Sequence, residues 1–172
     1  MDNSPKVLIM MGSDSDLPVM QEAADILAKF GVPHEIRISS AHRSPVRTMA
    51  LASEAAGRGI RIIIAGAGMA AHLAGVVAAK TTLPVIGVPM PGGSLNGVDA
   101  LYSTVQMPAG IPVATMAIGR AGAKNAGIFA VQILALTDDR LEEALGAYRL
   151  EMDREVAQKD AALQTSQAVN GF

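Results

Sequence analysis

Short apolar runs alternate with helical patterns along most of the chain. The apolar runs are rich in β-branched residues, and they predict strands at 6–11, 34–39, 61–65, 84–88 and 113–118. After each run come a turn and then apolar residues at helical spacing, which predict helices at 17–30, 45–57, 70–80, 99–106 and 121–135. Strands that alternate with helices form βαβ units on a parallel sheet.

The ends of these helices carry their own signals. Pro18 lies in the first turn of the first helix, Ser15 or Asp16 can cap it, and Gly31 follows its end. Ser44 and Pro45 are a cap and a first helical position. Five strands with intervening helices predict an α/β fold, a three-layer α/β/α sandwich around a flavodoxin-like parallel sheet.

The character of the sequence changes after residue 137. Residues 138–163 are densely charged and hold no turn residue except Gly146, so we expect a C-terminal helix there and a frayed tail after residue 164. A chain of 172 residues closes one hydrophobic core. We therefore predict a single catalytic domain over 1–172, with a sheet core over about 6–136.

Composition narrows the possible partners. Half of the residues are hydrophobic but only 3% are aromatic, so we expect an aliphatic core and an apolar surface that meets other subunits. A formal net charge of -2 argues against binding nucleic acid. The absence of cysteine excludes disulfides, thiolate zinc sites and cysteine nucleophiles.

Neither a targeting segment nor a membrane span is predicted. The first residues do not combine a basic segment, a long apolar stretch and a cleavage site, so we expect a cytoplasmic protein. Residues 62–79 are uncharged and long enough to suggest a span, but Gly66, Gly68 and Gly75 interrupt them and His72 lies among them. A buried strand, a tight turn and a packed helix fit this segment better.

Ligands of such sheets bind outside the carboxyl ends of the strands, where two of the three histidines lie. The turn 12–16 (GSDSD) offers amides, hydroxyls and a helix start that suit a phosphate. At least one of the carboxylates of Asp14 and Asp16 would accept hydrogen bonds from sugar hydroxyls. The alternative interpretation is a simple capping turn.

The turn 39–45 (SSAHRSP) is more specific. The imidazole of His42 can gain or lose a proton near neutral pH, and Arg43 can hold a phosphate or carboxylate through two parallel hydrogen bonds. A histidine in a loop is more often solvated or structural. The position of His42 at the pocket end, beside an arginine and a helix that starts with proline, favours a functional role.

Residues 66–71 match G-x-G-x-x-A between a strand and a helix, the dinucleotide fingerprint. No acidic residue follows before Asp99, and the motif stands on the third strand, so we reject NAD. The glycines would instead allow a smaller ligand to approach the backbone. His72 is either a donor that lines the pocket or a structural cap, and His34, at the other end of the sheet, is structural.

The sequence predicts neither a metal nor a catalytic triad. We find no acidic pair and no cluster of histidine and carboxylate residues with the spacing of metal ligands. Serines lie near His42, but there is no G-x-S-x-G elbow and no orienting acid is evident.

Taken together, these turns resemble a known family. The segments MGSDSD, SAHRSP, AGAGMAAHLAG, GVDALYSTVQMPAGIPVAT and AIGRAGAKNAG are similar, in order and spacing, to class I of the PurE family, the bacterial N5-carboxyaminoimidazole ribonucleotide mutases of purine biosynthesis. The resemblance spans about residues 7–136. The family commonly has glycine where this chain has Met69 and proline where it has Ala74.

The resemblance implies an octamer and a carboxylate transfer that needs no cofactor. The carboxyl group would move from the exocyclic nitrogen of the ribonucleotide substrate to ring carbon 4. A synthetase that uses ATP would make that carbamate substrate. A class II carboxylase that uses carbon dioxide directly, or a non-catalytic nucleotide- or flavin-binding module, is the alternative.

The resemblance also assigns roles to particular residues. His42 would be the general acid and base, and Ser13, Asp16 and Arg43 would bind the ribose 5-phosphate, with Ser15 also at the substrate. The residues expected around the base and the migrating carboxylate are Ser40, the turn 66–71 with Ala67, Gly68 and Met69, and His72.

Overall fold

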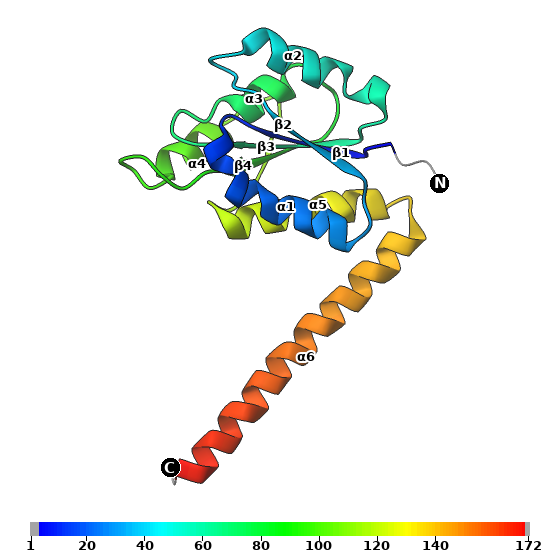
Figure 1. Ribbon diagram of the computed structural model, residues 1–172, viewed down its shortest axis with the longest axis vertical. Helices are drawn as coiled ribbons and strands as arrows, with labels where there is room; N and C mark the ends of the chain where they lie inside the picture. Colours follow the sequence, from blue (N-terminus) through cyan, green and yellow to red (C-terminus); the bar gives the residue numbers. More distant parts are fainter. Residues whose placement is uncertain (1–3, 171–172) are drawn as a thin grey trace. The chain divides into compact units, whose positions relative to one another are not determined.

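The computed structural model describes residues 4–170. Five parallel strands form one sheet in the order β2-β1-β3-β4-β5 (Figure 1). The strands are β1 (Val7–Met11), β2 (His34–Ile38), β3 (Ile62–Ala67), β4 (Val85–Pro89) and β5 (Ala114–Thr115). The predicted flavodoxin-like order is therefore confirmed.

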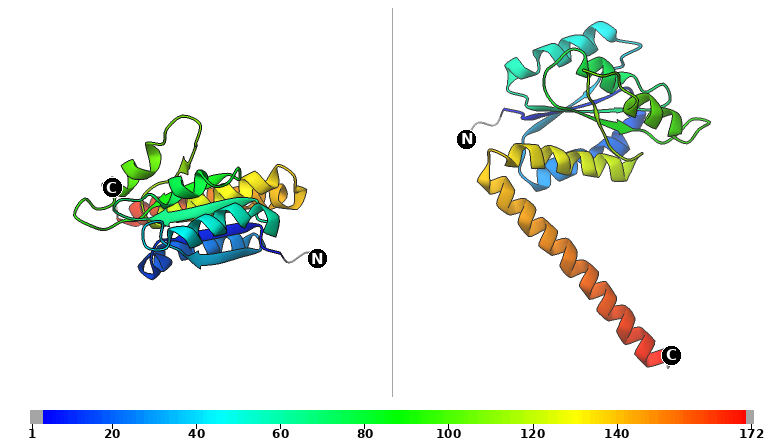
Figure 2. Two further views of the ribbon diagram at one scale, coloured as in Figure 1. Left: turned by 90° about the horizontal axis from the view of Figure 1, so that it is seen from above. Right: turned by 180° about the vertical axis from the view of Figure 1, so that it is seen from behind.

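Helices cover both faces of the sheet, which confirms the three-layer sandwich. Figures 1 and 2 show α1 and α5 on one face and α2, α3 and α4 on the other. The α-helices of this part are α1 (Leu17–Lys29), α2 (Pro45–Glu54), α3 (Leu73–Ala78), α4 (Val98–Val105) and α5 (Arg120–Ala135). Two short 3-10 helices, η1 (Asp14–Asp16) and η2 (Ala56–Arg58), flank α1 and α2.

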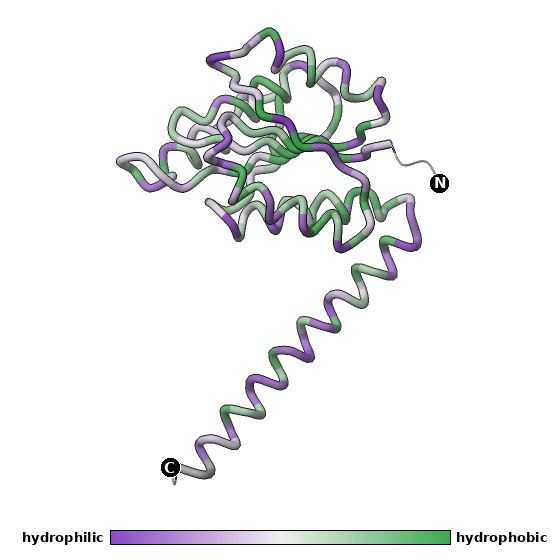
Figure 3. Tube along the Cα trace, in the orientation of Figure 1, coloured by the Kyte–Doolittle hydropathy of each residue, from purple (hydrophilic) through white to green (hydrophobic). Residues whose placement is uncertain are grey.

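The core lies on both sides of the three central strands, which are apolar along their length in Figure 3. Every residue of β1 and β4 is buried, as expected for parallel strands with helices on both faces. Leu8, Met10 and Ile63 pack with Leu73 and Val77 of α3 on one face. The edge strand β2 is less buried, as its alternating sequence predicts.

The register brings the carboxyl ends of the strands together. Met11 at the end of β1 pairs with Ile38 on one side and with Gly66 on the other. The chain continues from β1 to β2 on one side and later returns to β3 on the other, so the strand order reverses at β1. Ligands of open α/β sheets bind at such a switch point.

Several predicted boundaries were wrong. The strand predicted at 113–118 forms a ladder only at Ala114–Thr115, although Met116 N and Gly119 N still donate to carbonyls of residues 87 and 89, both at 2.9 Å. The helix predicted from residue 70 starts at Leu73 because β3 runs to Ala67 and moves the turn along the chain. The helix predicted at 45–57 ends at Glu54 and continues into η2.

The chain divides after Ile133 into two compact units, and the second holds α6 (Asp139–Asn170). The frayed tail expected after residue 164 is wrong, because α6 continues to Asn170 and no glycine or proline interrupts it after Gly146. Within residues 4–170, no helix has both the length and the apolar character to cross a membrane. That the two units act as one catalytic domain stays a prediction.

Candidate functional site

The first turn of the site, residues 12–16, follows β1 and is built around serine hydroxyls. The Ser13 hydroxyl accepts hydrogen bonds from the Ser15 backbone N–H at 3.3 Å and from the Ser15 hydroxyl at 2.9 Å. Asp14 accepts from the Ser13 hydroxyl and the Ser15 N–H, both at 3.1 Å. The turn is therefore held in one shape before any ligand arrives.

Asp16 lies at the inner end of this turn and is half-buried. Burial raises the pKa of its carboxyl above the ordinary aspartate value, and the charge of Asp14 acts in the same direction. A hydrogen bond from the Ser13 backbone and the positive charge of Arg43 act in the opposite direction and lower that pKa. A carboxyl group that has lost water in this way suits hydrogen bonds from sugar hydroxyls.

The second turn, residues 39–44, joins β2 to α2 and is tied together by its own hydroxyls. The Ser40 N–H donates to the Ser44 hydroxyl at 3.0 Å, and that hydroxyl donates to the Ser40 carbonyl at 3.1 Å. The Ser40 hydroxyl accepts from the Arg43 N–H at 3.2 Å. Below them, the buried hydroxyls of Ser39 and Thr48 bond at 2.8 Å. Ser44 occupies the predicted cap position of α2 but makes no capping hydrogen bond with its side chain.

Arg43 connects the second turn to the first. Its Nη2 donates to the Gly12 carbonyl at 2.9 Å, across the switch point. This bond fixes the plane of an exposed guanidinium and leaves other donors for a ligand. The structure thus brings Arg43 beside Ser13, as the resemblance implies.

His42 and His72 meet over the end of β1. His42 Nε2 and His72 Nδ1 lie 2.8 Å apart, in hydrogen-bond contact, with ring centroids at 4.9 Å and planes at 87°. His42 follows β2 and His72 immediately precedes α3, and β2 and β3 flank β1 on opposite sides. Both side chains are exposed. His72 makes no side-chain cap bond to α3, so the structure favours the alternative in which it belongs to the pocket.

The glycines of the third turn pack closely against methionine side chains. A Cβ on buried Gly66 would lie 2.5 Å from Met20 Sδ and 2.7 Å from Met90 Cε, and one on Gly68 would lie 3.3 Å from Met90 Cβ. That these glycines also allow a small ligand to approach the backbone stays a prediction. The neighbouring Ala67 and Gly68 are half-buried, and Met69 is 64% exposed.

A cavity of ≈ 470 Å³ lies at this edge of the sheet. Of the predicted residues, Ser13, Ser40 and Arg43 line it. The predicted residues that do not line it are Ser15, Asp16, His42, His72 and the turn 67–69. The remaining lining residues are Gly12, Asp14, Ile38, Ser39, Ser44 and Arg47. Arg47 was not among the predicted residues, although it lies four residues after Arg43, in the first turn of α2.

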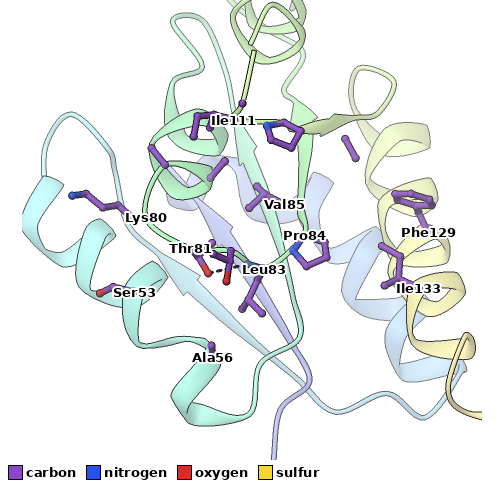
Figure 4. Close-up of a pocket in the computed structure, with 16 residues that line it drawn as sticks. Ser53, Ala56, Lys80, Thr81, Leu83, Pro84, Val85, Ile111, Phe129 and Ile133 are labelled. Carbon is purple, nitrogen blue, oxygen red and sulfur yellow. Dashed lines mark hydrogen bonds between the residues drawn. The ribbon is translucent and has the colours of Figure 1, made fainter. Parts of the chain in front are cut away.

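A larger cavity of ≈ 960 Å³ lies elsewhere, at the amino end of β4 (Figure 4). Pro84, Ile111, Phe129 and Ile133 line it, and Lys80 is its one charged lining residue. It contains no residue of the three turns, so size alone is a poor guide here. His34 is also remote from the site, and its Nδ1 lies 3.0 Å from the Val32 carbonyl oxygen, in keeping with a structural role.

The fold and the turns define a class of protein. A serine-rich turn, an arginine and a histidine pair gather at the switch point of a flavodoxin-like sheet, where α/β proteins of this class bind small ligands. Residues 6–155 match the model of the AIR carboxylase family, and the chain belongs to that family.

Similar proteins extend over nearly the whole chain. The chain is 56% identical to the N5-carboxyaminoimidazole ribonucleotide mutase of Pyrococcus horikoshii, over 93% of this chain and 89% of that protein. It is 55% identical to the phosphoribosylaminoimidazole carboxylase of Candida albicans, over 94% of this chain and 28% of that protein. The crystal structure of Treponema denticola PurE superposes with a TM-score of 0.83 at 31% identity, covering 92% of this chain and 98% of that one.

Met69 in the third turn has an unfavourable backbone conformation. Its φ of 52° lies in the left-handed region, which costs a residue with a side chain about 1 kcal/mol or more. Its side chain is largely exposed, so the burial of apolar surface offsets little of this cost. We expect Met69→Gly to raise the free energy of unfolding by about 1 kcal/mol in urea denaturation.

The matched control is Met69→Ala, which removes the side chain but keeps the unfavourable backbone. It should leave the free energy of unfolding close to that of the unmodified protein. Equal stability of the glycine and alanine variants would contradict this account of the turn.

Proposed function

We propose that the chain is an N5-carboxyaminoimidazole ribonucleotide mutase of purine biosynthesis. It moves the carboxylate of the substrate from the exocyclic nitrogen to ring carbon 4. The observation that carries this proposal is the contact between His42 Nε2 and His72 Nδ1 at 2.8 Å, next in sequence to Arg43, which lines a cavity of ≈ 470 Å³, in a chain of this family. The names of its similar proteins support the same reaction.

The substrate is held through its ribose 5-phosphate. The hydroxyl of Ser13 and the guanidinium of Arg43 lie on the cavity and bind the phosphate, and Ser15 adds a hydroxyl on the same turn. The half-buried carboxyl of Asp16 accepts hydrogen bonds from the ribose hydroxyls. When the phosphate and ribose are bound in this way, the aminoimidazole ring lies near the histidine pair, between the second and third turns.

The base and the migrating carboxylate occupy the space between those turns. Ser40 lies on the second turn, and Ala67, Gly68 and Met69 form the third, which ends at His72. The N–H groups of Gly68 and Met69 follow the end of β3, make no hydrogen bond within residues 4–170, and donate to the carboxylate. These residues line the pocket in the proposed complex.

His42 moves the proton that the reaction requires. As an imidazolium, it protonates the carbamate nitrogen, the bond between that nitrogen and the carboxyl carbon breaks, and the electron pair stays on nitrogen. Ring carbon 4 then attacks the released carbon dioxide, and neutral His42 takes the proton left on that carbon. The group must act first as acid and then as base, which suits a side chain that titrates near neutral pH.

His72 positions His42 for this task. An N–H···N bond holds one proton between two nitrogen atoms, so His72 fixes which nitrogen of His42 carries a hydrogen. The N–H···N bond keeps its own proton while His42 gives up and then regains the proton that the reaction moves.

Carbon dioxide stays next to the ring between the two chemical steps. Carbon dioxide that is held against the ring reacts as if it were present at a very high effective concentration. The reaction therefore avoids the entropy cost of capturing carbon dioxide from solution. This retention separates the mutase from a carboxylase that takes carbon dioxide from solution. The carboxylase is a real alternative, because the Candida albicans carboxylase is as similar to this chain as the mutases are.

Labelled bicarbonate distinguishes the two reactions. We expect the carbamate substrate to be converted in ¹³C-bicarbonate with almost no label in the product, because the carbon dioxide does not exchange with solvent before recapture. Mass spectrometry of the product measures the label. Incorporation that matches turnover would instead identify a carboxylase.

His42→Asn tests the role of the imidazole. We expect turnover of the carbamate substrate to fall by at least about 100-fold, the scale of general acid and base catalysis, while the product ribonucleotide still binds. A spectrophotometric assay and calorimetry measure the two quantities. His34→Asn, which changes a structural histidine, is the control and should keep full activity.

The result for His42→Asn also tests the remaining alternative. Full turnover in that variant would remove His42 from the mechanism. A purified protein that is yellow and inactive toward the carbamate would indicate a flavin-binding module instead.

Assembly into a homo-octamer follows from the family resemblance and has support in exposed apolar side chains. Val98, Tyr102 and Val105 are 44%, 61% and 47% exposed on one face of α4. On α6, Leu150 and Val156 are 59% and 66% exposed. Apolar faces of this kind are normally covered by another subunit.

Sedimentation velocity tests this assembly. We expect a species of eight times the 17.7 kDa chain, and we expect Leu150→Ser with Val156→Ser to produce smaller species. Gln158→Ser changes another exposed position of α6 and should leave the mass unaltered. A monomer at micromolar concentration would contradict the octamer.

The cellular setting follows from the proposed substrate. We place the enzyme in the cytoplasm, acting after an ATP-dependent synthetase that makes the carbamate. In this mechanism protein side chains alone supply the proton transfers, so it assigns no role to a cofactor or a metal.

A further inference from the structure

We infer that Arg47 is a second phosphate-binding residue of the proposed site and sets its preference for ribonucleotides over nucleosides. This inference rests on the proposed function for the identity of the substrate. Arg47 lines the same ≈ 470 Å³ cavity as Arg43 and Ser13. It is the third residue of α2, so its backbone belongs to a regular helix.

The position of Arg47 is fixed by its neighbour. Thr48 is buried, its hydroxyl bonds to the Ser39 hydroxyl at 2.8 Å, and it donates to the Ser44 carbonyl at 3.1 Å. These bonds fasten the first turn of α2 to the end of β2. The guanidinium of Arg47 therefore extends from a rigid base at the rim of the cavity.

The side chain of Arg47 has no interaction partner among the described residues. Within residues 4–170 it makes no hydrogen bond or ion pair, and it is exposed. By contrast, Arg37, Arg58 and Arg120 are paired with glutamates at 2.5–3.2 Å. All five donors of Arg47 are thus available to a ligand in the cavity.

Arg43 alone does not supply enough positive charge to balance a phosphate group. A phosphate monoester carries about -1.5 to -2 charges at neutral pH. The negative charge of Asp14, which also lines the cavity, offsets that of Arg43, and Arg47 makes the lining net positive. Arg43 also uses one donor on the Gly12 carbonyl, so a second guanidinium supplies both charge and hydrogen bonds.

Calorimetry with two pairs of probes tests this role. The first pair is ribose 5-phosphate and ribose, and the second is the product ribonucleotide and its nucleoside. Arg47→Ala should weaken binding of both phosphorylated probes by about tenfold or more, the effect of a charge-assisted hydrogen bond, and leave the nucleoside unaffected. Arg47→Lys should lose less, because it keeps the charge but not the planar fork.

Arg61→Ala is the matched control. Arg61 is also exposed, but it precedes β3 at the amino end of the sheet, so its removal changes the net charge equally without touching the cavity. It should bind all probes like the unmodified protein. An equal loss in Arg61→Ala, an equal loss for phosphorylated and unphosphorylated probes, or no loss in Arg47→Ala would each overturn the inference.

Failure of this inference differs from failure of the proposed function. If the protein converts the carbamate but Arg47→Ala binds normally, only the role of Arg47 falls. If the protein does not convert the carbamate but Arg47→Ala loses ribose 5-phosphate binding, the proposed reaction falls and the role of Arg47 stands.

Discussion

The hydrogen bond between His42 and His72 is the interaction on which the proposed chemistry depends. It joins two imidazoles that are 30 residues apart in sequence, and it forms only because β2 and β3 lie on either side of β1. A shift of register on either strand would move one ring away from the other. The parallel sheet thus serves as the frame that holds an acid and base pair in place.

The same frame separates binding from chemistry. Arg43 and the serine hydroxyls that we propose bind the phosphate lie on the first and second turns, and Arg43 connects these turns through the Gly12 carbonyl. The histidines lie on the second and third turns. In the proposed complex the substrate is anchored by its phosphate at one side of the switch point and presents its ring at the other, as a transfer within one molecule requires.

The sequence predicted those parts of the fold that local patterns determine. The buried run 7–11 and its polar turn gave β1 and the first turn, and the alternating run 34–38 gave an edge strand. It failed at β5 and α3, whose limits depend on contacts with β4 and on how far β3 extends. The continuation of α6 to Asn170 was missed because alanine and polar residues there were interpreted as a tail.

The turns that form the candidate site could be predicted from the sequence, but the contacts between their residues could not. His42, Arg43 and Ser13 were found from their positions after strands, and the structure brings them to one edge of the sheet. The packing around Gly66 was not predicted, since Met20 and Met90 come from other parts of the chain and their contact with it is a tertiary effect. Arg47 was missed because its place on the cavity depends on how α2 lies against the first turn.

Nitrogen NMR of protein labelled with ¹⁵N-histidine tests the imidazole pair most directly. Only three histidines are present, so the signals of His42 and His72 can be assigned with single variants. The account predicts a coupling across the hydrogen bond between His42 Nε2 and His72 Nδ1, with one nitrogen protonated and the other not. Two rings without coupling, each titrating independently of the other, would contradict it.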